Sequence, residues 1–202
     1  MLILASTSVY RRDLLARLKI DFRCESPGVD ETALPGEPPR TLAKRLAREK
    51  SLAVARRFPG FWVLGGDQVA DHAGTIITKP GSMSAARAQL QQFSGSSVAF
   101  YSAICLSRIA SAAGLAAEAA PEIKPYLDTT SVKFRRLTAA DIDAYLSAEP
   151  ALDCAGSFKS EGLGITLLDR IDSIDPTALI GLPLIKLAAM LREVGQIGRA
   201  HV

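Results

Sequence analysis

Residues 2–15, LILASTSVYRRDLL, pass from a short apolar run into three hydroxyl side chains and then into leucines at helical spacing. The apolar run predicts a buried β-strand, and the leucines predict an amphipathic helix over residues 10–18. A strand that leads directly into a helix is typical of an α/β fold. The turn between them has no glycine and is followed by two arginines, which suggests that the turn also binds a ligand.

The composition of this turn suits an anion. A strand-to-helix turn exposes free backbone N–H groups, and the helix dipole adds partial positive charge there. The hydroxyls of Ser6 and Ser8 and the guanidinium groups of Arg11 and Arg12 would complete a phosphate cradle. An ordinary helix cap with two surface arginines explains the same residues equally well. Neither G-x-x-x-x-G-K-[ST] nor G-x-G-x-x-G occurs in the stretch, so neither a P-loop nor a dinucleotide site is indicated.

Further elements alternate along the chain. Apolar residues recur at helical spacing in four more segments, 41–58, 82–95, 138–150 and 181–195. Strand-like patterns cover residues 20–26, 61–80 (two strands around a turn at 72–74), 96–110 and 127–137.

The order of these elements predicts an α/β fold with a mixed, twisted sheet flanked by helices, in two lobes with a cleft between them. Thr41 is the expected N-cap of its helix, and residues 111–125 are expected to form a connection with an exposed hairpin tip. The polar run CAGSFKSEG at 154–162 is expected to be a loop beside a strand formed by the apolar residues 163–168. No repeat or linker divides the chain, so a single domain over 1–202 is expected.

The overall composition limits the class of protein. Of the 202 residues 48% are hydrophobic, and the formal net charge is +3. This apolar content is enough for a packed core, and the slight charge suits an enzyme with a local basic pocket better than a nucleic-acid-binding protein. No apolar stretch approaches the roughly 18 residues of a membrane span. The beginning of the sequence has neither a basic leader nor a small-residue cleavage site, which predicts a cytoplasmic protein.

Cysteines and histidines exclude several kinds of site. Cys24, Cys105 and Cys154 are odd in number and far apart, which argues against a disulfide framework and a zinc site. His72 and His201 are the only histidines, so a histidine-based triad or a histidine-rich metal centre is not expected.

A second candidate site lies in VLGGDQV at 63–69, where two glycines precede Asp67. Glycines let a backbone approach a ligand closely, and an acid at the end of an apolar strand suits catalysis or metal binding. Glu31 is a second carboxylate for the same cation, because Mg²⁺ binds through one or two carboxylates plus substrate phosphates. Lys50 and Lys79 are candidates for neutralising phosphate charge. A tight turn, a solvated acid and surface lysines account for the same residues.

The third candidate is the loop at 154–162, in which two serines, a lysine and Glu161 gather beside a strand. A glutamate there can accept hydrogen bonds from the adjacent N–H donors of a guanine edge. A simple polar turn is the alternative.

Taken together, these stretches resemble the Maf family of nucleoside triphosphate pyrophosphatases, whose fold is related to that of inosine triphosphatases. The fragments that carry the resemblance occur in the family's order over nearly the whole chain: LASTSVYRR, VDE, LAREK, GGDQV, TKP, FSG, LDCAGSFKSEG and LIGLPL. The chain is most similar to the branch that acts on 7-methyl-GTP. Tyr10 stands at that branch's aromatic position, DQ replaces the DT of the dTTP/UTP branch, and SFKSEG carries its glutamate.

The resemblance implies a role for each candidate residue. It makes Asp67 the catalytic base or water-positioning acid, and it assigns Lys50 and Lys79 to stabilising charge on the triphosphate. The residues implied to bind the substrate phosphates and base are Ser6, Arg11, Tyr10, Gln68 and Glu161. The implied cofactor is a divalent metal cation, Mg²⁺ or Mn²⁺, with Glu31 and Asp67 as its ligands.

The expected function is therefore hydrolysis of 7-methyl-GTP to 7-methyl-GMP and pyrophosphate, a reaction that clears modified nucleotides. Alternatives are a pyrophosphatase for dTTP and UTP or for non-canonical purine triphosphates, and a nucleotide-binding regulator of septum formation. The expected partner is the nucleoside triphosphate, with no nucleic acid or membrane, and a homodimer remains open.

Overall fold

The computed structural model describes residues 1–111 and 120–198. The strands in this part of the chain are β1 (Leu2–Ala5), β2 (Phe22–Glu25), β3 (Trp62–His72), β4 (Thr75–Ile77), β5 (Ser97–Arg108), β6 (Glu122–Phe134) and β7 (Leu168–Asp172). The α-helices are α1 (Val9–Ala16), α2 (Pro39–Arg57), α3 (Met83–Phe93), α4 (Ala139–Ala148) and α5 (Leu184–Glu193). Two short 3₁₀ helices complete the set, η1 (Leu163–Leu167) and η2 (Ala178–Ile180).

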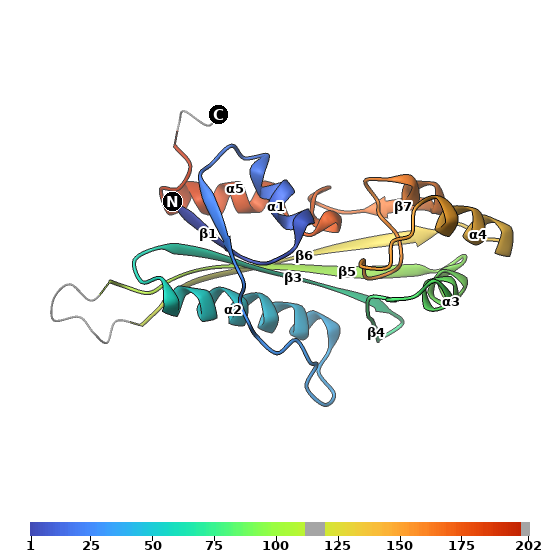
Figure 1. Ribbon diagram of the computed structural model, residues 1–202, viewed down its shortest axis with the longest axis horizontal. Helices are drawn as coiled ribbons and strands as arrows, with labels where there is room; N and C mark the ends of the chain where they lie inside the picture. Colours follow the sequence, from blue (N-terminus) through green and yellow to red (C-terminus); the bar gives the residue numbers. More distant parts are fainter. Residues whose placement is uncertain (112–119, 199–202) are drawn as a thin grey trace.

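The strands form one seven-stranded mixed sheet (Figure 1). Its order is β2-β1-β3-β5-β6-β7, and β4 also pairs with β3. β1 is parallel to both β2 and β3, whereas the pairs β3–β5, β5–β6 and β6–β7 are antiparallel. The mixed sheet flanked by helices confirms the predicted fold class.

Helices cover both faces of the sheet in the first lobe, which contains β1, β2, α1, α2 and α5. Leu4 and Leu64 belong to the cluster beneath α1 and α5, whereas their neighbours Ile3 and Val63 pack with α2. This alternation follows from the two-residue period of a strand. Because β1 is buried on both faces, all four of its residues, LILA, are apolar.

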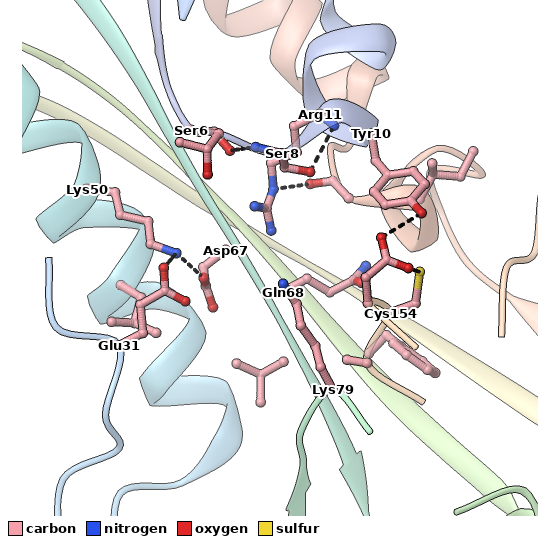
Figure 2. Close-up of a pocket in the computed structure, with 18 of the residues that line it drawn as sticks. Ser6, Ser8, Tyr10, Arg11, Glu31, Lys50, Asp67, Gln68, Lys79 and Cys154 are labelled. Carbon is pink, nitrogen blue, oxygen red and sulfur yellow. Dashed lines mark hydrogen bonds and ion pairs between the residues drawn. The ribbon is translucent and has the colours of Figure 1, made fainter. Parts of the chain in front are cut away.

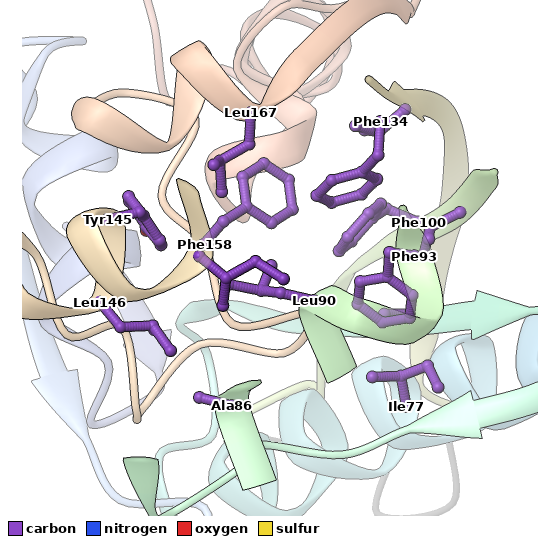
Figure 3. Packing of buried hydrophobic residues seen from close by; sticks show 14 of the residues in the cluster. Ile77, Ala86, Leu90, Phe93, Phe100, Phe134, Tyr145, Leu146, Phe158 and Leu167 are labelled. Carbon is purple, nitrogen blue, oxygen red and sulfur yellow. The ribbon is translucent and has the colours of Figure 1, made fainter. Parts of the chain in front are cut away.

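The second lobe contains β4, β7, α3 and α4. Its core packs around the far halves of β5 and β6, and Figure 3 shows the aromatic side chains at its centre. Phe158 contacts Phe100 and Phe134 edge to face, with ring centroids 5.7 and 5.2 Å apart. Because Phe158 is part of this core, with Gly156 and Ser157 buried beside it, it anchors the polar loop at 154–162, of which Glu161 is exposed.

Three local expectations are corrected. α2 begins at Pro39 with Pro38 as its N-cap, so Thr41 lies inside the helix and does not cap it; proline fits a first turn because its missing N–H has no partner there anyway. Residues 163–167 form η1 and not a strand, and the strand β7 follows from Leu168. β6 begins at Glu122, inside the segment 111–125 expected to be a connection and hairpin tip, and residues 112–119 of that segment lie outside the described residues.

A gap in the sheet edge fixes the place of the site. β1 ends at Ala5, opposite Gly65, and β4 joins β3 only from Ala70 onward. Residues 66–69 of β3 therefore have β5 on one side and no paired strand on the other, as far as the structure is described. Side chains from both faces of the sheet can meet at such a gap. Ligands of α/β sheets commonly bind at points where the strand order breaks in this way.

Within residues 1–111 and 120–198, no helix combines the length and the apolar character needed to cross a membrane.

Candidate active site

The turn from β1 into α1 forms one side of the gap. The side chain of Ser8 caps α1 by accepting a hydrogen bond from the Arg11 backbone N–H at 3.4 Å. The Ser6 hydroxyl accepts from the Ser8 N–H at 3.1 Å, and Ser6 is buried. The turn is thus a helix cap, as one interpretation of the sequence held, and it also lines the pocket described below.

Only the first of the two arginines enters the site. Arg11 Nε donates to the Gly181 carbonyl oxygen at 3.3 Å, and the side chain passes along Gly66, where a Cβ atom would lie 3.4 Å from Arg11 Cδ. Burial lowers the pKa of Arg11, while Asp67 and Glu31 favour its charged form. Arg12 is exposed and pairs with Asp13.

Gly65 allows α2 to approach the sheet. A Cβ atom there would lie 2.6 Å from the Ser51 backbone nitrogen and closer still to the Ala47 carbonyl oxygen. Helix and strand therefore pack backbone against backbone, which brings the buried side chain of Lys50 to Asp67. The two glycines before Asp67 thus have separate roles. Gly65 leaves room for the backbone of α2, and Gly66 leaves room for the side chain of Arg11.

Lys50 joins the two carboxylates that the sequence singled out (Figure 2). Its Nζ atom lies 2.7 Å from Asp67 Oδ1 and 2.7 Å from Glu31 Oε1. Desolvation raises the pKa of Asp67, although the positive charges of Lys50 and Arg11 act in the opposite direction. A buried carboxyl that keeps a raised pKa beside two cations is a stronger base than a free one.

Glu31 reaches Lys50 from a loop that a separate ion pair holds. Arg45 of α2 donates to Glu37 at 2.8 Å and to the Thr32 carbonyl oxygen at 3.0 Å. The hydrogen bonds from Arg45 lower the pKa of Glu37 to about 2. The loop that carries Glu31 is in this way tied to the helix that carries Lys50.

This ion pair gives the protein an acid-sensitive element. The pKa of Glu37 is lower in the folded state than its usual value of 4.5. The Glu37–Arg45 pair therefore stabilises the fold above pH 4.5, and this contribution is lost as the pH falls toward about 2. Thermal unfolding of the wild type and of Glu37→Gln, followed over this pH range, should show a gap in Tm that closes at the acid end. A gap that stays constant with pH would show that Glu37 acts without its charge.

The other end of the gap is aromatic and polar. The Tyr10 hydroxyl donates to Asp153 Oδ2 at 2.9 Å, and the Lys159 ammonium lies 5.5 Å from the centre of the Tyr10 ring. Gln68 Nε2 donates to the Ala178 and Leu179 carbonyl oxygens at 3.0 and 2.9 Å, so the amide nitrogen is held by η2. Glu161 is exposed at the rim.

Apart from the Arg12–Asp13 and Glu37–Arg45 pairs, the side chains described above line one pocket of 1070 Å³, slightly above the usual size of about 300–1,000 Å³ for ligand sites. The nine candidate residues from the sequence all lie in its wall: Ser6, Tyr10, Arg11, Glu31, Lys50, Asp67, Gln68, Lys79 and Glu161. Arg11, Lys50 and Lys79 supply positive charge at the end near Asp67, whereas Tyr10 and the 154–162 loop form the opposite end (Figure 2). Their catalytic and binding roles stay predictions.

Sequence reasoning did not single out Asp153 and Lys159 as site residues. Both stand in LDCAGSFKSEG, from which only Glu161 was selected. The signal that could have found them was the density of charged residues around the anchoring Phe158. Both contact Tyr10 of α1, which is remote in sequence.

The expected metal site consists of two carboxylates. Among the residues that the structure describes, no group of three or more His, Cys, Asp and Glu side chains is placed to hold a metal ion. Glu31 and Asp67 do converge on one positive charge, that of Lys50. Burial raises the pKa of Asp67 although Lys50 and Arg11 lie close to its carboxyl group. The two carboxylates fit a Mg²⁺ or Mn²⁺ ion whose other ligands are phosphate and water oxygens.

The fold and this pocket define an α/β protein with a pocket between two lobes that is cationic at one end and aromatic at the other. Residues 1–194 match the family model described as "Maf-like protein". The chain therefore belongs to the Maf family, which confirms the resemblance inferred from its sequence.

Curated relatives are similar over almost their whole length. The chain is 57% identical over 194 residues to the "7-methyl-GTP pyrophosphatase" of Xanthomonas campestris pv. campestris (strain 8004), with 96% of each chain covered. It is 50% identical to the protein of the same name from Albidiferax ferrireducens, covering 96% of this chain and 93% of the relative.

Solved structures show the same fold at low sequence identity. A HAM1 protein from Coxiella burnetii aligns with a TM-score of 0.52 at 16% identity, over 95% of this chain and 98% of that chain. The Staphylococcus aureus Ham1 protein aligns with a TM-score of 0.51 at 13% identity, over 96% of this chain and 98% of that one. At such identity the likeness concerns the fold alone.

Proposed function

We propose that this protein hydrolyses 7-methyl-GTP to 7-methyl-GMP and pyrophosphate and so clears a modified nucleotide. The names of the relatives at 50–57% identity support this activity. The observation that carries it is the division of one pocket into a cationic end with a buried carboxylate and an aromatic end with a rim carboxylate. A nucleoside triphosphate has the matching parts. The cytoplasm, where nucleotides are used, is the proposed location.

In the proposed reaction a water molecule attacks the α-phosphorus. Its oxygen forms the new bond, the bond from the α-phosphorus to the bridging oxygen breaks, and pyrophosphate leaves with that electron pair. Asp67 accepts the proton of the attacking water. Lys50 holds Asp67 Oδ1 at 2.7 Å and so orients the carboxylate. This lysine therefore positions the base, while Lys79 is the more exposed cation for the leaving pyrophosphate.

The phosphate chain requires fixed positive charge in the pocket. Arg11 is held in place by the Gly181 carbonyl oxygen and needs no rearrangement to meet an anion. The buried Ser6 hydroxyl lies beside it in the wall of the pocket. When bound, Mg²⁺ or Mn²⁺ at Glu31 and Asp67 would spread the phosphate charge and lower the barrier to attack.

Base recognition is assigned to the opposite end. 7-Methylguanine carries a delocalised positive charge, and a cation over an aromatic face gains about 0.5–2 kcal/mol. Tyr10 offers that face, and Glu161 offers a carboxylate for the guanine N–H donors. Since the Gln68 amide nitrogen is engaged by η2, its oxygen is the atom available to a substrate donor.

The experiment is a panel of kcat/KM values for 7-methyl-GTP, GTP, UTP, dTTP and a non-canonical purine triphosphate, followed by pyrophosphate release with and without Mg²⁺ or Mn²⁺. The wild type should prefer 7-methyl-GTP and require the metal. Tyr10→Ala and Glu161→Ala should each reduce that preference by about two- to tenfold. Preference for UTP or dTTP would assign the protein to the alternative substrates, and binding without turnover would support the regulatory alternative.

Arg11→Ala should weaken the binding of every nucleoside triphosphate to a similar extent, since Arg11 lies at the phosphate end of the pocket. The loss of a charge-assisted contact costs roughly 1.5–3 kcal/mol. Arg12→Ala is the matched control, because Arg12 is exposed, pairs with Asp13 and does not line the pocket. Binding titrations with several nucleotides measure the effect. A change in base preference at constant affinity for the other triphosphates would exclude Arg11 from phosphate binding.

A further inference from the structure

Tyr10 is held from across the pocket by two charged residues. The ring stands on α1, whereas Asp153 and Lys159 belong to the loop that Phe158 anchors in the second lobe. The phenol hydroxyl donates to Asp153 Oδ2 at 2.9 Å, and Lys159 Nζ lies 5.5 Å from the ring centroid. All three line the pocket (Figure 2 shows the Tyr10 hydroxyl and its bond).

Both partners are charged at neutral pH. Desolvation opposes ionisation of Asp153, but the hydrogen bond from Tyr10 and the charge of Lys159 lower its pKa below the usual range. Hydrogen bonding to Tyr10 raises the pKa of Lys159. Burial raises the pKa of Tyr10 itself to about 12, so the phenol stays protonated and donates. The ring therefore stands between a carboxylate at its edge and an ammonium near its face.

These two charges act on a bound base in opposite directions. A carboxylate that accepts the phenol hydrogen makes the ring richer in electrons, and its own negative charge attracts a positive base. The ammonium group of Lys159 already interacts with the electrons of the Tyr10 ring, and a cationic base would have to share this interaction. Lys159 is also a like charge near the ring and repels a positive base stacked there. A neutral guanine feels neither effect to the same degree.

We propose that Asp153 and Lys159 are specificity-determining residues that tune, with opposite signs, how strongly the pocket prefers a cationic base over a neutral one. The proposal rests on the function proposed above, because it concerns the base end of the same pocket. Asp153 strengthens the preference for 7-methyl-GTP over GTP. Lys159 limits it by competing for Tyr10.

The chain contains a matched set outside the pocket. Tyr126 donates to Asp128 Oδ2 at 3.3 Å, and Lys186 Nζ lies 5.6 Å from the Tyr126 ring centroid. Neither Tyr126 nor Lys186 lines the pocket. Lys186→Met therefore removes a lysine from an equivalent tyrosine without touching the base end, and Met keeps the apolar stem of the side chain.

The test is the ratio of kcat/KM for 7-methyl-GTP to kcat/KM for GTP, measured at mildly acidic pH, where the methylated base keeps its N1 proton and its positive charge. Lys159→Met should raise this ratio by about two- to fivefold, and Asp153→Asn should lower it by about the same factor. Lys186→Met should leave it unchanged. In a Tyr10→Leu background both effects should shrink, since the ring through which they act is gone. Thermal unfolding of each variant checks that the fold is intact.

General damage to the loop would lower both rates and could not move the ratio in opposite directions. Ratios that stay constant, or that move the same way in both variants, would overturn the proposal. The ratio is measurable whichever nucleotide the wild type prefers. A wild type that prefers UTP, with the ratios shifting as expected, would refute the proposed function and leave this inference standing. If the wild type prefers 7-methyl-GTP and the ratios of the variants stay constant, the proposed function stands and this inference is refuted.

Discussion

Asp67→Asn should lower kcat by about 10²–10⁴, because the amide cannot accept the proton of the attacking water. Asparagine keeps the shape of the side chain, and its amide oxygen can still accept the hydrogen bond from Lys50. Binding of a triphosphate analogue with a non-hydrolysable α–β bridge should therefore change little. Single-turnover rates and equilibrium titrations separate the two effects.

Asp71→Asn provides the control on the same strand and the same face of β3. Asp71 accepts a hydrogen bond from the Gly74 N–H and does not line the pocket. Its replacement should leave kcat close to the wild-type value. An Asp67→Asn protein with near wild-type turnover would remove this aspartate from the mechanism, while lost analogue binding would make it a binding residue.

The second large effect is expected at Gly65, where Gly65→Ala should destabilise the fold by about 3 kcal/mol or more. The new methyl group would meet backbone atoms of α2, which cannot move aside as a flexible side chain can. Helix α2 has to shift from β3, and Lys50 shifts with it. Denaturant unfolding measures the stability, and kcat should fall in whatever fraction folds.

Two other glycines separate these effects. A Cβ atom at Gly66 would lie 3.2 Å from Leu182 Cδ2 and 3.4 Å from Arg11, so Gly66→Ala should mainly weaken phosphate binding. Gly198 has nothing within 4 Å of the added carbon, and Gly198→Ala should be close to neutral. Equal stability of the Gly65 and Gly198 variants would contradict the close packing of α2 on β3.

Much of the fold could be predicted because periodicity reports burial. β1 and α1 were recognisable from apolar runs and leucine spacing, and Thr138, at the start of the helical segment predicted over 138–150, is the N-cap of α4. The predictions of secondary structure were wrong where local hydrogen bonds outweighed the hydrophobic pattern. Residues 163–167 are apolar like a strand but turn as a 3₁₀ helix, since the Gly164 N–H is held by Glu149 of the preceding loop at 3.2 Å.

The site shows a similar division. The ordered motifs brought out Asp67, Lys50 and Arg11, and the structure places these residues in one pocket. Sequence could not show that Lys50 bonds both carboxylates, because Glu31, Lys50 and Asp67 come from a loop, a helix and a strand. The partnership of Tyr10 with Asp153 joins residues 143 positions apart and was equally hidden.

The continuity of the sheet determines how a nucleotide enters and leaves. β5 and β6 stay paired from Ser97–Lys133 to Arg108–Glu122, and β3 also runs from the first lobe into the second. Lobes joined by three unbroken strands cannot swing apart about a linker as hinged domains do. We therefore expect a nucleotide to enter and leave through the mouth of the pocket, past the exposed side chains of Glu31 and Glu161, without a movement of the lobes.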